Sequence, residues 1–169
     1  ALLRWLAPIL HFTAEEAWAM FTGNEDDSIL FHTFAQLPSV DKAEALRHKW
    51  SMLREVRTEV QKSLEALRVN GDIGSSLAAE VTLYASGETY QHLASLQDDL
   101  RFVLITSHAQ VVEIAANEPT RIEALATTQP KCERCWHHTA DVGQHAEHPT
   151  LCGRCVSNIA GTGEVRAYV

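Results

Sequence analysis

Apolar residues recur along this chain with two periods, one typical of helices and one typical of strands. The longest regular pattern spans residues 42–68, where an apolar residue returns every three or four positions. This spacing places the apolar side chains on one stripe and predicts a long amphipathic helix, with Asp41 as its amino-terminal cap. The stripe consists of Leu46, Trp50, Leu53, Val56, Val60, Leu64 and Leu67.

Shorter patterns predict the remaining elements. Alternation of apolar and polar residues indicates strands, and a period of three to four residues indicates helices. We therefore expect helices at 2–10, 13–23 and 89–99, strands at 79–85, 102–106 and 109–115, an extended connector at 29–37, and a linker at 118–129 that could add a strand in the full protein. The second helix should begin with a capping box formed by Thr13 and Glu16.

All four cysteines lie in two Cys-x-x-Cys pairs, with sixteen residues between the pairs. Two intervening residues allow a tight turn to aim both sulfurs of a pair at one point, and the second pair completes a tetrahedron of thiolates. Such a set is typical of a structural zinc site and leaves no position for a water or a substrate. We expect one structural Zn²⁺ with four ligands, namely Cys132, Cys135, Cys152 and Cys155.

Other uses of these cysteines stay open. Two disulfides would require an oxidising compartment, which nothing else in the sequence indicates. Iron could be bound by the same thiolates, since spacing alone does not select the metal. A histidine between the pairs could replace a cysteine as ligand, although exposed loop positions are the simpler interpretation for all four: His137, His138, His145 and His148.

Together these patterns predict an α+β chain in three parts: helices at 1–37, a long helix with a small α+β unit at 38–128, and a zinc-ribbon-like module at 129–169. No apolar run approaches the roughly 18 residues that a membrane span requires, so we expect no membrane partner. The first residues begin within a helical pattern, lack an initiator Met and do not fit a signal peptide. We therefore expect a piece of a longer protein.

The net charge of −8 is unevenly distributed. Residues 1–130 carry all of it, whereas 131–169 hold four basic and four acidic residues, and 42–68 hold seven basic and four acidic residues. A contact with a polyanion such as RNA should therefore be local, on the zinc module and the long helix.

Within the zinc module, Lys131, Arg134 and Arg154 are the candidate phosphate contacts. The two arginines each precede the second cysteine of a pair, which predicts positions on the rim of the metal site. Trp136 could stack on a base, but a core anchor is the favoured interpretation in so small a module.

On the long helix, Arg47 and Arg54 are weaker candidates. They share a sector of the helix with other arginines and could face phosphate, but a solvated edge of ion pairs with neighbouring glutamates is the favoured interpretation. No set of nucleophile, base and orienting residue is visible, nor is a Gly-rich phosphate loop. We expect no catalysis from this chain alone.

Three segments resemble one protein family. Residues 4–18, Arg-Trp-Leu-Ala-Pro onward, resemble the end of the anticodon-binding helical domain of class I synthetases for branched aliphatic amino acids. Residues 73–81 resemble a later segment of bacterial isoleucyl-tRNA synthetases. The two cysteine pairs with their neighbours, 131–137 and 151–158, are similar to the carboxy-terminal zinc module of that family, and 161–164 to its final residues. His138 departs from the family pattern, where an aromatic residue is more common.

The resemblance implies a cytoplasmic, monomeric enzyme that uses ATP to attach isoleucine to its tRNA and edits valine errors. Neither the His-x-Gly-His nor the Lys-Met-Ser-Lys-Ser signature of the catalytic domain occurs here, so ATP would bind only in a part absent from this sequence. This chain would then be a tRNA-binding tail beginning with the remnant of an anticodon-binding domain at 1–37. Its partners would be the isoleucine-specific tRNA and the rest of the synthetase.

Two other classes of protein remain as alternatives. DNA-repair glycosylases of the formamidopyrimidine type have a similar zinc finger, but they need an amino-terminal Pro-Glu start that this chain lacks. A zinc-stapled protein-interaction module would bind no nucleic acid. Comparing the binding of tRNA with that of duplex DNA would separate the three.

Overall fold

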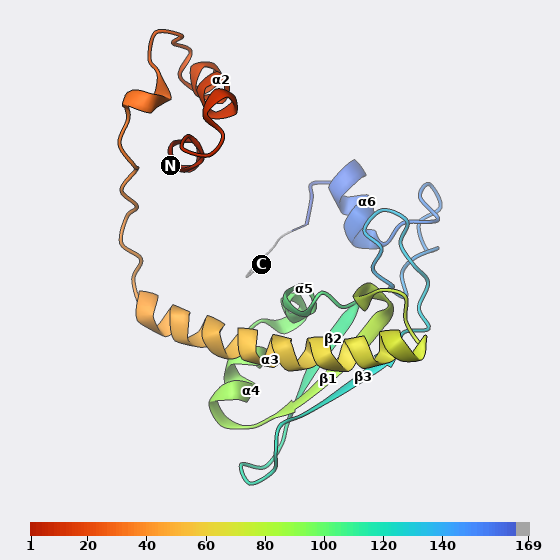
Figure 1. Ribbon diagram of the computed structural model, residues 1–169. Helices are drawn as coiled ribbons and strands as arrows, with labels where there is room; N and C mark the ends of the chain where they lie inside the picture. Colours follow the sequence, from red (N-terminus) through yellow and green to blue (C-terminus); the bar gives the residue numbers. More distant parts are fainter. Residues whose placement is uncertain (165–169) are drawn as a thin grey trace. The chain divides into compact units, whose positions relative to one another are not determined.

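The computed structural model describes residues 1–164 and contains two compact units, one from Ala1 to Glu44 and one from Ala45 onward (Figure 1). The three-part division predicted at 37/38 and 128/129 stays a prediction, and its last five residues lie outside the described part. Among the described residues, no helix is long and apolar enough to cross a membrane.

The first unit has two helices and a short turn around a small core. Helix α1 (Leu2–Leu6) and helix α2 (His11–Thr22) precede the 3₁₀ turn η1 (Ile29–Phe31). Ala14 and Trp18 of α2 are buried against Ile29. α2 ends as expected at Gly23, whose φ of 67° suits a residue without a Cβ.

The capping box predicted at Thr13 and Glu16 is wrong, because α2 begins two residues before Thr13. Leu10 holds the cap position, and no side chain caps this end of the helix. The chain turns tightly after α1, so that Ile9 and Leu10 both donate backbone hydrogen bonds to the Leu6 carbonyl, at 2.9 and 2.8 Å. The new helix therefore starts directly after this turn. The connector expected at 29–37 likewise begins with a turn of 3₁₀ helix rather than as extended chain.

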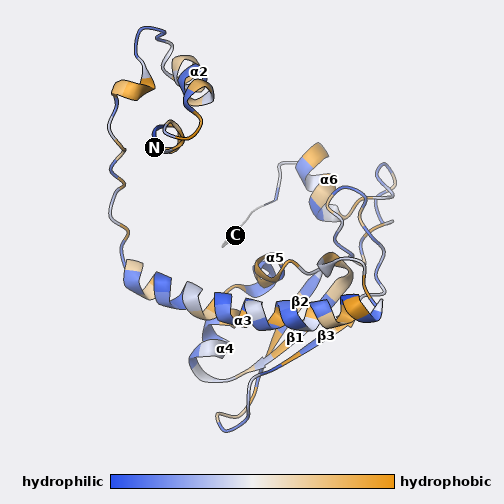
Figure 2. Cartoon of the chain, viewed as in Figure 1, coloured by the Kyte–Doolittle hydropathy of each residue, from blue (hydrophilic) through white to orange (hydrophobic). Residues whose placement is uncertain are grey.

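Helix α3 (Ala43–Asn70) leads into the second unit and ends two residues later than expected. Asp41 lies two residues before the helix and so does not hold the capping position. The apolar stripe predicted from the sequence is confirmed at its centre, where Leu53, Val60 and Leu64 are buried against the sheet. Figure 2 shows apolar and polar residues alternating along this helix, as its amphipathic pattern requires.

A three-stranded sheet of order β2-β1-β3 lies under α3. The central strand β1 (Ala79–Ala85) has the predicted bounds, and alternate residues from Ala79 to Ala85 are buried. β2 (His108–Glu113) runs parallel to it, pairing Val81 with Ala109, and β3 (Arg121–Ala126) runs antiparallel. A parallel pair needs a long crossover, which three short helical segments supply: α4 (Gly87–Ala94), η3 (Gln97–Asp99) and α5 (Leu100–Leu104).

One predicted strand of this unit is wrong. The apolar run at 102–106 is not a strand; its first residues belong to α5, in which Leu100 and Leu104 are buried one helical turn apart. Short apolar runs do not distinguish a buried strand from a buried helix. The segment at 118–129, expected as a linker that could add a strand in the full protein, does contain a strand: Ile122 and Ala124 of β3 pack against the core. The predicted helix at 89–99 is split into α4 and η3, with Leu93 and Leu96 buried as expected.

The four cysteines belong to the second unit, beyond the sheet. A β-bridge joins Lys131 and His138 across the first pair, and helix α6 (Gly153–Ala160) carries Cys155 of the second pair. The fold class is thus α+β, as predicted: helices, one small sheet and a cluster of four cysteines.

Candidate metal centre and nucleic-acid interface

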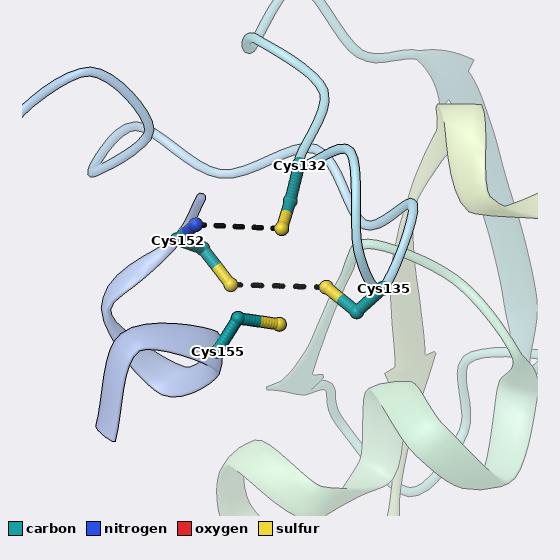
Figure 3. A group of neighbouring side chains, drawn as sticks. All are labelled: Cys132, Cys135, Cys152 and Cys155. Atoms are coloured by element: carbon teal, nitrogen blue, oxygen red, sulfur yellow. Dashed lines mark hydrogen bonds between the residues drawn. The ribbon is translucent and has the colours of Figure 1, made fainter. Parts of the chain in front are cut away.

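The four sulfurs converge on one point (Figure 3). All lie within 4.8 Å of one another, and Cys135 Sγ and Cys152 Sγ are 3.7 Å apart. A disulfide needs about 2.05 Å between sulfurs, so this pair is not bonded. Two thiolates on a tetrahedral zinc with Zn–S bonds of about 2.3 Å lie about 3.8 Å apart. The donor set therefore fits one tetrahedral Zn²⁺ and leaves no coordination position open.

Two tight turns produce this geometry. In the first, the Cys132 carbonyl accepts a hydrogen bond from Trp136 N at 2.9 Å, while Cys132 N donates to the His137 carbonyl at 2.8 Å. In the second, Cys152 caps helix α6, and its carbonyl accepts from Val156 N at 3.0 Å. Because the two turns face each other, Cys152 N also lies 3.4 Å from Cys132 Sγ (Figure 3).

The protein environment shifts the pKa values of these thiols in different directions. Burial alone would raise the pKa of Cys132, but backbone N–H groups, chiefly those of Cys135 and Cys152, lower this pKa to about 6. Burial raises the pKa of Cys152 to about 12, and the neighbouring thiols of Cys132 and Cys135 add to this rise. Full ionisation of all four therefore requires a cation, which is the role a structural metal fills.

Asp141 braces the second turn from outside the ligand set. Its Oδ2 accepts a hydrogen bond from Gly153 N at 2.6 Å. A Cβ at position 153 would lie 2.9 Å from that oxygen and 3.2 Å from His145 Nε2. A glycine is therefore needed where the chain passes between the cysteine turn and Asp141.

The module is attached to the α+β unit by contacts that surround Phe102. His138 N donates to Ser107 Oγ at 2.6 Å, the His137 ring meets Phe102 edge-to-face at 5.6 Å, and Arg154 lies over the same ring at 5.0 Å. Sequence reasoning missed these supporting residues. The sequence predicts a strand at or beside Phe102 and Ser107, and no local motif marks a residue whose partner lies about 30 positions away.

Comparison with known proteins supports two parts of the chain separately. Residues 1–83 match a family model described as the anticodon-binding domain of tRNA ligase, and residues 129–158 match one described as the zinc finger found in FPG and IleRS. The zinc-finger match alone does not distinguish the synthetase from the glycosylase alternative, because its description covers both.

Similar curated proteins make the distinction. The chain is 57% identical over 171 residues to an isoleucine–tRNA ligase of Janthinobacterium sp. (strain Marseille), and 54% identical to one of Cupriavidus pinatubonensis. It is also 54% identical to isoleucine–tRNA ligase 1 of Burkholderia mallei. By sequence, the chain is similar to isoleucine–tRNA ligases over nearly all of its own length. Each match covers 98 or 99% of this chain but only 18% of the relative.

The isoleucine–tRNA ligase resemblance predicted from three short motifs is thereby confirmed, and the glycosylase alternative is not favoured. One structural zinc agrees with both the zinc-finger match and the clustered cysteines. The histidines of the module are not in this cluster: among the described residues, the group around Cys132 contains four cysteines and no histidine.

The expected exposure of those histidines is wrong. His137, His138, His145 and His148 are all half-buried. His137 is enclosed against Phe102, and burial lowers its pKa, which favours the neutral ring.

The interpretation of Trp136 as a core anchor is also wrong. Its side chain is 60% exposed, and its φ of 66° turns it outward immediately after Cys135. The Lys131 ammonium lies 5.3 Å from the centre of the indole ring. The metal turn thus presents an exposed aromatic face with a cation beside it.

The two arginines beside the metal site differ in exposure and in their partners. Arg134 is exposed, and its Nη1 lies 3.5 Å from Cys155 Sγ; this hydrogen bond raises the pKa of the guanidinium further. The Arg154 side chain is only 22% exposed and pairs with Glu164 at 3.4 Å. On α3, Arg47 and Arg54 are exposed and lie away from the cysteine turns in sequence. The six candidate contacts therefore differ in exposure and come from two separate stretches of the sequence.

Proposed function

We propose that this chain is the tRNA-binding, carboxy-terminal region of an isoleucine–tRNA ligase and supports attachment of isoleucine to its tRNA. The observation that carries the proposal is the match of residues 1–83 to an anticodon-binding domain in a chain 57% identical to such a ligase. Activation of isoleucine with ATP would take place in another part of the synthetase, since the chain spans about a fifth of its relatives.

The first unit supports a role within a larger protein. Several of its large apolar side chains are more than 60% exposed, which is more than a small free-standing unit usually leaves uncovered: Phe12, Met20, Phe21, Phe31 and Phe34. We propose that the rest of the synthetase chain covers them. The parent would act as a cytoplasmic monomer with the isoleucine-specific tRNA as its partner.

Within the zinc module, we propose that Trp136 and Lys131 make the principal RNA contact. An exposed indole can stack on an unpaired base, and stacking of this kind is worth about 1–3 kcal/mol per base. The neighbouring ammonium can bind the phosphate of the same nucleotide. A bulky residue with positive φ is uncommon, and the cysteine turn that enforces it also aims the ring at solvent.

Arg134 would add a phosphate contact from the exposed side of the same turn. Arg154 would instead act within the protein, because it already pairs with Glu164 and lies over Phe102. Arg47 and Arg54 would contribute weaker, long-range attraction from α3. With a net charge of −8, affinity for tRNA should be weak and should fall as salt is raised, because the few local cations release counterions from the phosphates that they bind.

The experiment compares Trp136→Ala and Lys131→Ala with a control, Lys62→Ala, in the full-length synthetase. Lys62 is exposed on α3 and pairs with Glu59. We expect Trp136→Ala to lower the kcat/KM for tRNA charging by roughly tenfold, the loss of one stacked base. Lys131→Ala should reduce the salt dependence of tRNA binding by about one counterion. The control should charge normally.

Two further measurements make the result decisive. Isoleucine-dependent exchange of pyrophosphate into ATP should stay unchanged, because activation does not use this region. Zinc content should also stay at one per chain, since Trp136 is exposed and supplies no ligand. Normal charging by both variants across a range of salt would mean that the zinc module has only a structural role, and it would contradict the proposed contact.

A further inference from the structure

A second group of metal-binding side chains lies far in sequence from the cysteines. His48 on α3 and Glu88 and His92 on α4 bring two imidazole nitrogens and a carboxylate oxygen within 4.8 Å of one another. Glu88 and His92 are four residues apart, so they share one face of α4. His48 meets them from the neighbouring helix, and its ring centre is 6.2 Å from that of His92.

The distances fit coordination to one ion. Glu88 Oε1 lies 3.2 Å from His48 Nε2 and also 3.2 Å from His92 Nε2. Two donors about 2.05 Å from a tetrahedral Zn²⁺ are separated by about 3.3 Å. A separation of 3.2 Å also suits a hydrogen bond, and His92 makes one with Glu88. What points to a metal is that two imidazole nitrogens converge on the same carboxylate oxygen at a spacing that a shared ion would also set.

We propose that His48, Glu88 and His92 form a binding site for a divalent transition metal that joins α3 to α4. Two imidazoles and one carboxylate suit Zn²⁺, Cu²⁺ and Ni²⁺ and disfavour Mg²⁺ and Ca²⁺. Three protein donors leave further coordination positions for water. This site differs from the four-thiolate centre, which is closed and has only sulfur ligands.

The position of the site gives it a mechanical role. At the start of α3, Leu46 is 47% exposed and the fully buried stripe begins only at Leu53, so apolar packing holds the first turns weakly. Lys49 Nζ donates to Ser95 Oγ at 2.7 Å, which already joins this part of α3 to the end of α4. A metal on His48, Glu88 and His92 would add a second, stronger link one turn of α4 away. It would fix the direction in which the long helix leaves the sheet.

The test titrates the 169-residue chain, with one zinc already in its cysteine site, with further ZnCl₂ by isothermal calorimetry. The wild-type chain should bind one additional equivalent. His48→Ala, at an exposed helix position, should weaken that binding by more than about tenfold, because even residues behind the ligands change metal affinity by about 10–100-fold. The melting temperature of the wild-type chain, but not of this variant, should rise with excess Zn²⁺.

Glu88→Gln separates a metal site from a hydrogen-bonded group. The amide oxygen can still accept hydrogen bonds from both imidazoles but is a poor zinc ligand, so the second equivalent should be lost. His108→Ala and His148→Ala remove imidazoles elsewhere and should bind like the wild type. The proposal is overturned if the wild-type chain binds one zinc only, if Glu88→Gln keeps the second equivalent, or if His148→Ala loses it. None of these results depends on tRNA.

Discussion

The sheet and the zinc module of the second unit maintain their folds by different means. The sheet, with its helices, encloses twelve buried residues, ten of them large aliphatic side chains such as Leu53 and Leu83. In the zinc module the buried cluster consists of three cysteines, with Cys135, Val142 and Leu151 packed around it. A segment of about 40 residues cannot bury enough apolar surface alone, so a metal replaces the missing core.

The difference also explains what each region offers to a partner. A region stabilised by apolar packing needs its large side chains in the core, as the sheet does with Leu53 and Leu83. A region stabilised by a metal can expose them, as the zinc module does with Trp136. The module thus presents an aromatic surface without losing a core residue, and this is why we place the principal RNA contact there.

The largest effect should follow from loss of one metal ligand. Cys155→Ser replaces a buried thiolate, and zinc binding contributes about 10–16 kcal/mol in small zinc modules near neutral pH. We expect zinc content to fall well below one per chain and limited proteolysis to cleave within 129–164, while the sheet stays protected. A protease-resistant module without zinc would show that apolar packing suffices there.

In the sheet, the corresponding test is a substitution that leaves a cavity in the apolar core. Leu83 is completely buried in the central strand, and Leu83→Ala should lower the free energy of unfolding by about 2–5 kcal/mol. Urea unfolding followed by circular dichroism measures this loss. Zinc content should remain at one per chain. Loss of zinc together with the sheet would mean that the two regions share one folding unit, contrary to the comparison.

A smaller effect tests the brace of the second cysteine turn. Gly153→Ala would place a Cβ 2.9 Å from Asp141 Oδ2 and push that carboxylate away from the backbone N–H it accepts. We expect a loss of about 1–3 kcal/mol, typical of overpacking. Faster transfer of zinc to a chromophoric chelator would report it. Asp141→Asn, which keeps an acceptor oxygen and the shape, should transfer zinc more slowly than Gly153→Ala.

The first unit extends the comparison to a region held by a polar group. Asp27 accepts hydrogen bonds from His32 at 2.7 Å and from the Trp18 indole at 3.0 Å, and these lower the pKa of its carboxyl below 3.8. A lowered folded-state pKa means that the contribution to stability is complete above the unfolded value, near pH 4, and is lost as pH falls through the folded pKa. Hydrogen exchange of the Trp18 indole should therefore accelerate below about pH 4.

Asp27→Asn provides the control for that pH dependence. It removes the ionisable group while keeping an oxygen to accept from the indole, so exchange should be faster at neutral pH and should lose the acid transition. An unchanged acid transition in the variant would assign the effect to another carboxyl group.

The sequence predicted best where the pattern was long or chemically specific. The stripe on α3 spans about six turns, and the four cysteines have one spacing that suits zinc, so both were found. The sequence prediction failed at 102–106, because a short apolar run does not decide between helix, strand and loop until its neighbours are known. At 118–129 the prediction was a linker that could add a strand, and the alternation of Arg121, Ile122, Glu123 and Ala124 is the signal that favours the strand.

Within the site, the sequence identified the ligand residues but not their surroundings. Trp136 was assigned to a core because aromatic residues are usually buried; its outward direction depends on a positive φ that no propensity predicts. Asp141, twelve residues from Gly153, and Ser107, thirty-one residues from His138, act through hydrogen bonds that exist only after folding. Contacts of this kind can be identified only from the folded structure.

The most direct test of the difference between the two regions is hydrogen–deuterium exchange of the chain before and after removal of zinc by a chelator. If a metal replaces a core in the zinc module, exchange should rise strongly across 131–160 and stay unchanged in β1 and in α3 around Val60. Readdition of one equivalent of Zn²⁺ should restore protection. Equal increases in both regions, or protection in the module that survives complete removal of zinc, would contradict this account.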